Sequence, residues 1–357
     1  MITIRPATEA DAAAWQAMVE ASPSGDFLQD WAWADVAAFD GQPQRRFVAV
    51  EDGDLVALAA AQVRPLPLGR SFWYVPHGPV LDYDHPRAGD RLRAMAIGLR
   101  EAARGAKGIA VKLEPRLELG SAATADFRRL RHDPRTLQVG QTRLVELGDD
   151  ETMLAGFDKD TRYGVRRAER EGVDVTRTDD ADDRRAIDEL HALVLETQAR
   201  AGFPRPPLER YRTAWHSLAD GGRASIFEAH REGRLLASGM LVIEGHRSFY
   251  LFSGSVREEH GEPKRYASYA LQWAMMRHAR DRGVRVHDLW GIAPDGAGPE
   301  HPWYGVGLFK KGFGGRAVAW AGTWDVVADR TLYRMRGMTE AGKSAARDLA
   351  GRIGWRR

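Results

Sequence analysis

Hydrophobic and polar positions in the first third of the chain recur with two periods, near two and near 3.6 residues, which indicate strands and helices. Apolar runs with the length of β-strands lie at Ile2–Arg5, Arg45–Val50, Leu55–Val63, Ser71–Val75 and Ile109–Leu113. The residues Thr8-Glu9-Ala10-Asp11 form a capping-box pattern, which predicts a helix from there to Ala21. An amphipathic helix is predicted over Asp90–Gly105. Strands and helices in this mixed order predict an α/β unit.

The same order of elements recurs in the second half of the chain. Helices are predicted over Thr152–Glu171, Ala181–Ala201, Leu208–Leu218 and Tyr266–Arg282. Strands are predicted over Ala224–His230, Arg234–Ile243, Ser248–Ser253 and Val284–Leu289. The sequence is not literally repeated, but the repeated order predicts two similar α/β halves that meet near Gly148-Asp149-Asp150. Since no low-complexity linker separates them, we expect the halves to pack closely.

The composition is that of a folded protein, and it excludes several kinds of chemistry. Of 357 residues, 43% are hydrophobic and 29% are charged, which suits two domains that each bury a core. The absence of cysteine excludes disulfides, thiolate zinc sites and cysteine nucleophiles. The 11 histidines show no zinc-binding spacing, and neither a nucleophile elbow nor a Walker loop occurs. We therefore expect no metal and no cofactor.

The sequence also bears on location and on charged partners. The first residues lead into Pro6 and a polar helical pattern, and no apolar run reaches roughly 18–20 residues, so a cytoplasmic protein is predicted. With 52 Lys and Arg against 50 Asp and Glu, the net charge of +2 predicts no general attraction to nucleic acids or membranes. An anionic partner therefore requires a local basic patch.

One such patch is predicted on the helical segment Lys159–Arg170. Arg162, Arg166 and Arg170 recur there with i, i+4 spacing and so lie along one side of the helix. Such a row can follow a nucleic-acid backbone, or it can be a solvated face that two neighbouring glutamates partly neutralise. The spacing leaves both interpretations open.

The segment Trp303–Gly315, with the sequence WYGVGLFKKGFGG, is the most unusual in the chain. Five glycines surround Lys310 and Lys311, and two phenylalanines, Phe309 and Phe313, flank the lysines. One interpretation is a cationic loop that faces a phosphate or a carboxylate in an aromatic groove. The other is a glycine-rich hairpin with solvated lysines, and the spacing favours neither.

Two further residues have side chains suited to a site. Asp288 lies at the end of an apolar strand, where ligands commonly bind, and it is interpreted either as a general base or as a turn cap. Arg205 lies in Phe203-Pro204-Arg205-Pro206-Pro207, a stiff extended loop that suits phosphate recognition. It can equally be an ordinary surface residue.

Short segments along nearly the whole chain match one known family in their order. They lie at Phe27–Trp33, Tyr74–Asp82, Lys159–Val173, Phe249–Ser255, Leu271–Trp273, His287–Ile292 and Gly307–Gly315. Together these segments resemble the Fem aminoacyltransferases (FemABX).

The resemblance implies both a fold and a function. The fold is α/β, with two GNAT-like (acyl-CoA N-acyltransferase-like) mixed-sheet domains and without the helical-hairpin arm of some members. The first domain is expected to span residues 1–148 and 323–357, and the second residues 149–322. The implied reaction moves an amino acid from aminoacyl-tRNA to the stem-peptide side-chain amine of a UDP- or lipid-linked muramyl peptide. A monomer with a peripheral contact to the inner membrane leaflet is expected.

The resemblance also implies roles for individual residues. Phe309 and Lys310 match the family pair beside the reacting ester, where the lysine stabilises developing negative charge. Residues that match positions near the precursor, and are assigned to substrate binding, are Arg205, Tyr211, Tyr250, Glu114 and Trp31. The residues assigned to tRNA are Arg162, Arg166 and Lys311. A lysine that often follows the first matching segment is absent, since Ala34-Asp35-Val36-Ala37-Ala38 stands there.

Two other functions are compatible with the residues. The first is a GNAT-type acyl-CoA N-acyltransferase, although Arg257–Tyr266 (REEHGEPKRY) holds one glycine and is a poor cradle for pyrophosphate. The second is a non-catalytic RNA-binding module built on the row of arginines in Lys159–Arg170. The net charge of +2 disfavours general affinity for RNA.

Overall fold

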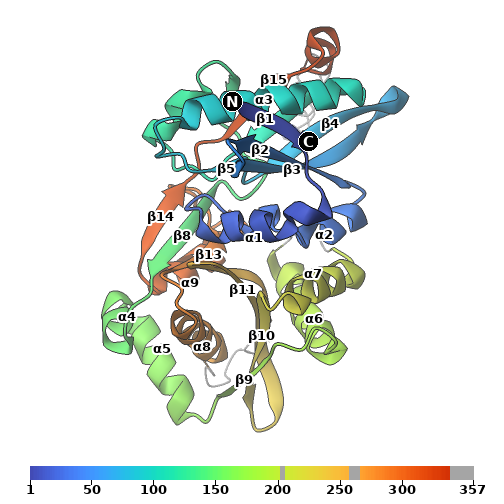
Figure 1. Ribbon diagram of the computed structural model, residues 1–357. Coiled ribbons are helices and arrows are strands. Elements are labelled where there is room, and N and C mark those ends of the chain that lie inside the picture. Colours follow the sequence, from blue (N-terminus) through green and yellow to red (C-terminus); the bar gives the residue numbers. More distant parts are fainter. Residues whose placement is uncertain (202–205, 257–265, 338–357) are drawn as a thin grey trace, which may run out of the picture.

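The computed structural model describes residues 1–201, 206–256 and 266–337, with the side chains of 199–201 excepted. Arg205 and residues 257–265 of the predicted poor pyrophosphate cradle lie outside the described residues. The described chain forms two mixed β-sheets, one in each half, with α1 (Ala12–Ala21) and α2 (Trp33–Phe39) lying between them (Figure 1).

The first sheet has the strand order β1-β2-β3-β4-β6-β15-β7, and β5 pairs with β3 off this path. Its strands are β1 (Ile2–Pro6), β2 (Gln44–Glu51), β3 (Asp54–Leu66), β4 (Arg70–Pro76), β5 (Val80–Leu81), β6 (Gly108–Glu114), β7 (Arg131–Asp133) and β15 (Thr323–Val327). Neighbours pair antiparallel except β4 and β6, which are parallel. The connection between these two parallel strands contains the long helix α3 (Ala88–Gly105).

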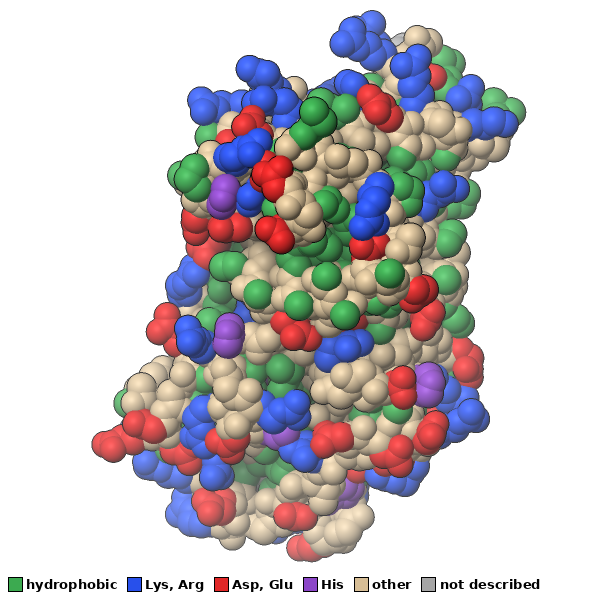
Figure 2. Space-filling view, viewed as in Figure 1, with side chains coloured by type: hydrophobic (Ala, Val, Ile, Leu, Met, Phe, Trp, Pro, Cys, Tyr) green, Lys and Arg blue, Asp and Glu red, His purple; other side chains and the backbone are tan. Residues whose placement is uncertain are grey.

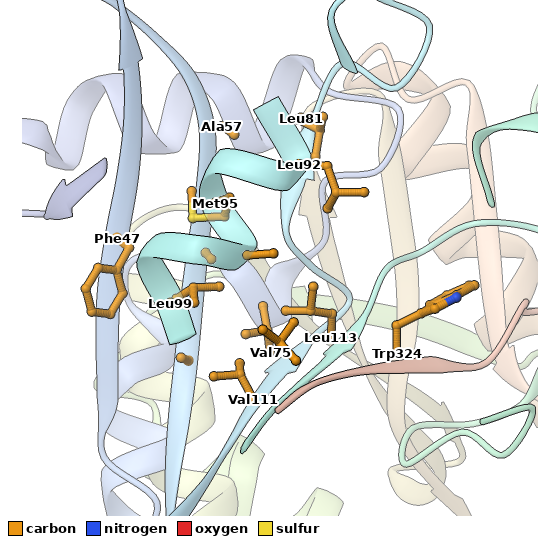
Figure 3. Close-up of a cluster of buried hydrophobic side chains, with 14 of the residues drawn as sticks. Phe47, Ala57, Val75, Leu81, Leu92, Met95, Leu99, Val111, Leu113 and Trp324 are labelled. Carbon is orange, nitrogen blue, oxygen red and sulfur yellow. The ribbon is translucent and has the colours of Figure 1, made fainter. Parts of the chain in front are cut away.

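The core of the first domain lies between α3 and the sheet. Leu92, Met95, Ala96, Leu99 and Ala103 recur every three or four residues, so they form one apolar face, and all of them are buried. This face packs against strand residues that include Val75, Val111 and Leu113 (Figure 3). The periodicity read from the sequence therefore predicts which face of α3 is buried.

The second sheet has the order β14-β8-β13-β12-β11-β10-β9, with β12 and β13 parallel. Its strands are β8 (Gln141–Glu146), β9 (Asp174–Thr178), β10 (Ala224–Arg231), β11 (Arg234–Glu244), β12 (Arg247–Ser255), β13 (Val286–Gly291) and β14 (Arg316–Ala319). Its helices are α4 (Asp150–Gly156), α5 (Lys159–Arg170), α6 (Arg184–Ala201), α7 (Leu208–Asp220), α8 (Ala267–Asp281) and α9 (Tyr304–Gly312). One apolar cluster joins α6 and α7 to the sheet, and a separate one joins α5 and α8 to it.

Two strands bear on the division into domains. β8 lies before the predicted boundary at residue 148, yet it pairs with β13 and β14 of the second sheet. β15, from the late part of the chain, pairs with β6 and β7 of the first sheet. We therefore propose that the first domain consists of the residues before Gln141 together with those that begin at Thr323.

The glycine-rich segment forms the helix α9, so the loop and the hairpin predicted there are both wrong. The rings of Phe309 and Phe313 pack on Tyr269, with centroids 5.3 and 6.0 Å away. This packing outweighs the low helix propensity of glycine, which costs about 1 kcal/mol for each residue. Gly312 is needed where α9 meets α5, because a Cβ there would lie 2.1 Å from Thr161 Oγ1.

The single helix predicted over Thr152–Glu171 is also wrong, since the segment forms two helices, α4 and α5. The chain is extended at Phe157 and Asp158 between them. Asp158 caps α5, because its Oδ1 accepts a hydrogen bond from Thr161 N at 2.6 Å. The aspartate three residues before a threonine was the signal for this second helix start.

Candidate functional site

A buried ion pair joins the two domains. Arg116 follows β6 of the first domain, and its Nη2 lies 2.6 Å from Oδ2 of Asp288 in β13 of the second domain. Both side chains are almost inaccessible to solvent. The guanidinium carbon of Arg116 lies 4.9 Å from the ring centroid of Trp320 and 5.4 Å from that of Phe249. The pair is therefore held between aromatic rings at the domain interface.

The second oxygen of Asp288 fixes the turn that leaves β13. Its Oδ1 accepts hydrogen bonds from Thr142 Oγ1 and, at 2.8 Å, from Trp290 N. Trp290 has a backbone φ of +61°, a value that residues other than glycine rarely adopt. The turn then delivers the carbonyl of Gly291, which accepts a hydrogen bond from Lys310. Asp288 thus acts as a turn cap, one of the two interpretations of the sequence, and its partner Arg116 lies in the other domain.

Lys310 is the buried cation of this site. It lies in the last turn of α9, is 7% exposed, and its Nζ donates a hydrogen bond to Gly291 O at 2.7 Å. Burial lowers the pKa of Lys310 to about 7, although the charge of Asp288 opposes this shift. A lysine in this state is a strong donor when protonated and exchanges its proton near neutral pH.

A neutral histidine lies close to Lys310. Burial and the charge of Lys310 lower the pKa of His287 to about 3. Its Nε2 lies 2.6 Å from Gln272 Nε2, and its Nδ1 lies 2.8 Å from Ser248 Oγ. Because the amide nitrogen of Gln272 donates to Nε2, Nδ1 carries the proton and donates to the serine. His287 is therefore a structural group, and Lys310 remains the group that titrates near neutral pH.

The first domain contributes a second buried acid to the interface. Asp26 Oδ2 lies 2.8 Å from His77 Nδ1 and 3.5 Å from Arg116 Nε. Burial alone would raise the pKa of Asp26, but His77 and Arg116 outweigh this effect and hold the pKa below its usual value. Asp26, Arg116 and Asp288 therefore form one line of alternating charges from the first domain to the turn beside Lys310.

Other contacts make the interface close-fitting. Arg247 donates hydrogen bonds to the carbonyl oxygens of Ser22 and Pro23 in the first domain. Burial lowers the pKa of Arg247 to about 10. A Cβ at Gly245 would lie 2.1 Å from Glu20 O, so only glycine fits there. These contacts fix the turn between β11 and β12 against the first domain.

Glu114, which was assigned to substrate binding, is buried and forms hydrogen bonds with other residues of the protein. It accepts hydrogen bonds from Tyr74 OH at 2.6 Å and from the backbone N–H groups of Leu137 and Gln138 at 3.0 and 3.1 Å. The next residue, Val139, reaches Gly291, since a Cβ on that glycine would lie 2.8 Å from Val139 Cγ1. Glu114 therefore holds a loop against the strand end that positions Lys310.

The structure places Phe309 beside a cavity. The cavity has a volume of about 270 Å³, and its lining includes Leu236, Val256, Tyr266, Tyr269 and Phe309. Phe309 and Lys310 are consecutive on α9, so the aromatic cavity and the buried cation lie on neighbouring sides of one helix turn.

The other residues assigned to the precursor are not brought together. Tyr211 packs in the cluster of α6 and α7, with its ring centroid 4.5 Å from that of Phe252. Tyr250 packs in the cluster of α5 and α8, and burial raises its pKa to about 12. Trp31 lies in the first domain, where the guanidinium of Arg46 stacks 3.7 Å from its ring centroid. Both tyrosines are buried, and Arg205 lies outside the described residues.

The three basic residues assigned to tRNA lie on two helices that meet. Asp158 N, at the start of α5, donates a hydrogen bond to Gly312 O at 2.9 Å, which joins α5 to the end of α9. Arg166 and Lys311 are exposed. Arg162 is partly buried and donates to Phe157 O, so part of its hydrogen-bonding capacity is already used.

Sequence reasoning missed Arg116, Asp26 and His77 as members of the site. His77 lies in a segment that carries the family resemblance, but nothing local indicates its partner. A charged residue between Pro115 and Leu117 at the end of an apolar strand was the one available signal for Arg116.

Comparisons with known proteins match both halves of the chain. Residues 11–130 match a family model described as the FemAB family, and residues 135–301 match one described as an acetyltransferase (GNAT) domain. The lipid II:glycine glycyltransferase of Staphylococcus aureus strain MRSA252 is 24% identical over 400 aligned residues, covering 89% of this chain and 92% of that protein. The corresponding protein of strain USA300 has the same identity and coverage.

Solved structures show the same fold. A crystal structure of FemX superposes with a TM-score of 0.83 at 21% identity, covering 93% of this chain and 99% of that one. A tandem GNAT protein from the clavulanic acid biosynthesis pathway superposes with a TM-score of 0.54 at 14% identity, covering 92% and 99%. The prediction of two GNAT-like mixed-sheet domains is therefore confirmed.

The fold, the buried lysine and these matches define the protein as an acyltransferase of the tandem GNAT class. Within that class, the FemAB model over residues 11–130 and the staphylococcal relatives along 89% of the chain support the Fem family. The matches favour an enzyme over the non-catalytic RNA-binding module. Among the described residues, no helix is long and apolar enough to cross a membrane.

Proposed function

We propose that this enzyme moves an amino acid from aminoacyl-tRNA to the side-chain amine of a lipid-linked peptidoglycan stem peptide. The observation that carries this proposal is Lys310, buried and fixed by Gly291 O beside the end of β13. The name of the staphylococcal relatives, lipid II:glycine glycyltransferase, supports a lipid-linked acceptor and glycine as the amino acid.

The chemistry needs few protein groups because the aminoacyl ester is already activated. The acceptor amine attacks the ester carbon, a C–N bond forms, and the C–O bond to the tRNA ribose breaks. The ribose oxygen leaves and takes up a proton, while the amine nitrogen loses one. Negative charge develops on the carbonyl oxygen in between, and a preorganised ammonium group stabilises it strongly in a site without water. Lys310 supplies that group, and Phe309 lines the adjoining apolar surface.

The direct test uses the purified enzyme with pools of charged tRNA and with lipid-linked and UDP-linked precursors. Mass spectrometry of the products is expected to show the lipid-linked precursor heavier by whole amino-acid residues. An increase only on the UDP-linked precursor would contradict the choice of acceptor. Transfer from acetyl-CoA instead, together with calorimetric binding of acetyl-CoA, would favour the second candidate, an acyl-CoA transferase, which the GNAT family match supports.

The pH dependence tests the role of Lys310. Because its pKa is lowered to about 7, the protonated fraction falls as the pH rises through that value. If the ammonium form stabilises the oxyanion, the kcat/KM of the wild type, divided by that of a variant whose charge does not titrate, is expected to decline about tenfold for each pH unit above 7. The measurement is kcat/KM between pH 5.5 and 9, corrected for hydrolysis of the aminoacyl ester.

A charge-retaining variant is the control for this pH profile. Lys310→Arg keeps its charge at every pH in the range, so its smaller activity should lose the alkaline decline. A decline that persists in Lys310→Arg would assign the titration to a group other than Lys310.

The basic residues on α5 give a test of tRNA binding. Reversing the charge of exposed Arg166 to Glu is expected to raise KM for aminoacyl-tRNA and to leave KM for the precursor unchanged. Each lost phosphate contact should reduce the slope of log affinity against log salt by roughly one. Arg184→Glu, at an exposed position on α6, is the matched control. An unchanged salt slope for Arg166→Glu would show that α5 is a solvated face.

A further inference from the structure

A groove lies on the outer surface of the first domain, between α3 and the residues that follow the 3-10 helix Ala122–Phe127. Its volume is about 370 Å³. The floor is apolar and includes Leu92, Ala96 and Val326, while Ile97 stands at the surface with 42% of its area exposed. No residue of the groove belongs to the candidate active site in the second domain.

Four arginines line the sides of this groove: Arg93, Arg100, Arg128 and Arg129. Arg93 is 3.3 Å from Asp90, and Arg128 Nε donates to Ala125 O at 2.9 Å. Within the described part of the chain, the side chains of Arg100 and Arg129 have no ion pair or hydrogen bond. Figure 2 shows Lys and Arg side chains gathered at the end of the molecule where α3 lies in Figure 1.

One acidic residue, Asp126, also lines the groove, but it is turned toward the start of α3. A Cβ at Gly89 would lie 2.7 Å from Asp126 Oδ1, and Asp126 also contributes to raising the pKa of buried Tyr83. The groove therefore combines an apolar floor with a positive rim. That combination fits an amphiphile with an anionic head better than a fully polar ligand.

We propose that this groove docks the enzyme on an anionic phospholipid surface, with the arginines on lipid phosphates and Ile97 among the glycerol and upper acyl groups. The proposal rests on the proposed function, because a lipid-linked acceptor lies in such a surface. RNA is the other large polyanion to consider. A single-stranded RNA site usually provides aromatic rings for base stacking, and none of the described residues lining the groove is aromatic.

The test is binding to vesicles of defined composition. The wild-type chain is expected to cosediment with vesicles of phosphatidylglycerol and phosphatidylethanolamine, more weakly as salt increases, and not with phosphatidylcholine alone. Each arginine near an anionic surface strengthens binding roughly fivefold, so Arg100→Ala with Arg129→Ala should weaken it about 25-fold. Arg184→Ala with Arg234→Ala is the matched control, since both side chains are exposed arginines on the second domain.

Three results would overturn the proposal. These are no binding to the anionic vesicles, equal loss of binding in the two double variants, and loss of tRNA affinity instead of vesicle affinity in the groove variant. Thermal unfolding of each variant shows whether it is folded. Transfer to the lipid-linked precursor dispersed in detergent separates the two proposals, because the groove variant should keep this activity even if docking on vesicles fails.

Discussion

Lys310→Ala is expected to lower kcat/KM for amino-acid transfer about 100–1,000-fold, the usual cost of removing one preorganised oxyanion donor. The Nζ of Lys310 is buried and donates a hydrogen bond to Gly291 O at 2.7 Å. Because this position is buried, we expect no exposed side chain to take its place in the variant. The loss should lie mainly in kcat, since the charge that Lys310 stabilises develops only in the transition state. Single-turnover transfer from purified aminoacyl-tRNA measures it directly.

Lys310→Met is the control that separates catalysis from folding. Burial lowers the pKa of Lys310, so the folded state disfavours the charge that the unfolded chain carries freely. This cost is fully present below pH 7 and disappears as the pH rises toward the ordinary lysine pKa. Lys310→Met is therefore expected to gain roughly 1–3 kcal/mol of stability at pH 6 while losing transfer. Near-normal turnover in either variant would remove Lys310 from the mechanism.

Local patterns predicted most elements of the fold but not the way in which the domains exchange strands. The period of α3 and the apolar runs Arg45–Val50 and Leu55–Val63 depend on neighbouring residues, and the structure has α3, β2 and β3 at these positions. The helix α9 was missed because its glycines obscure the period, and only contacts with Tyr269 and Thr161 explain it. β15 joins the first sheet by pairing with β6, which lies more than 200 residues earlier.

The candidate site divides in the same way. Lys310 and Phe309 were assigned to a site from one continuous segment, through its residues and its family resemblance. The partner of Asp288 lies 172 residues away, and no periodicity connects residues at that separation. For Asp288 the sequence left a general base and a turn cap open, and it could not show that the cap is tied to the other domain. The pairing of Asp26, Arg116 and Asp288 depends on how the two domains pack, so it cannot be predicted from the sequence around any one of them.

The line of charges leads to the second large prediction, the effect of Asp288→Asn. Removing one partner of a buried ion pair typically costs 3–5 kcal/mol, and here Asp26 still faces Arg116 at 3.5 Å, so about 3 kcal/mol is expected. Urea unfolding measures this loss, and Arg116→Met combined with Asp288→Asn should recover part of it, because no guanidinium is then buried without Asp288 and Asp26 keeps His77 at 2.8 Å.

If Asp288 also sets the charge of Lys310, its removal should change the pH dependence of transfer, which a purely structural ion pair would not. The charge of Asp288 raises the pKa of Lys310 against the effect of burial, so Asp288→Asn should shift the alkaline decline of kcat/KM to lower pH. If the variant is less stable but its pH profile is unchanged, Asp288 holds the domains together without setting the charge of Lys310.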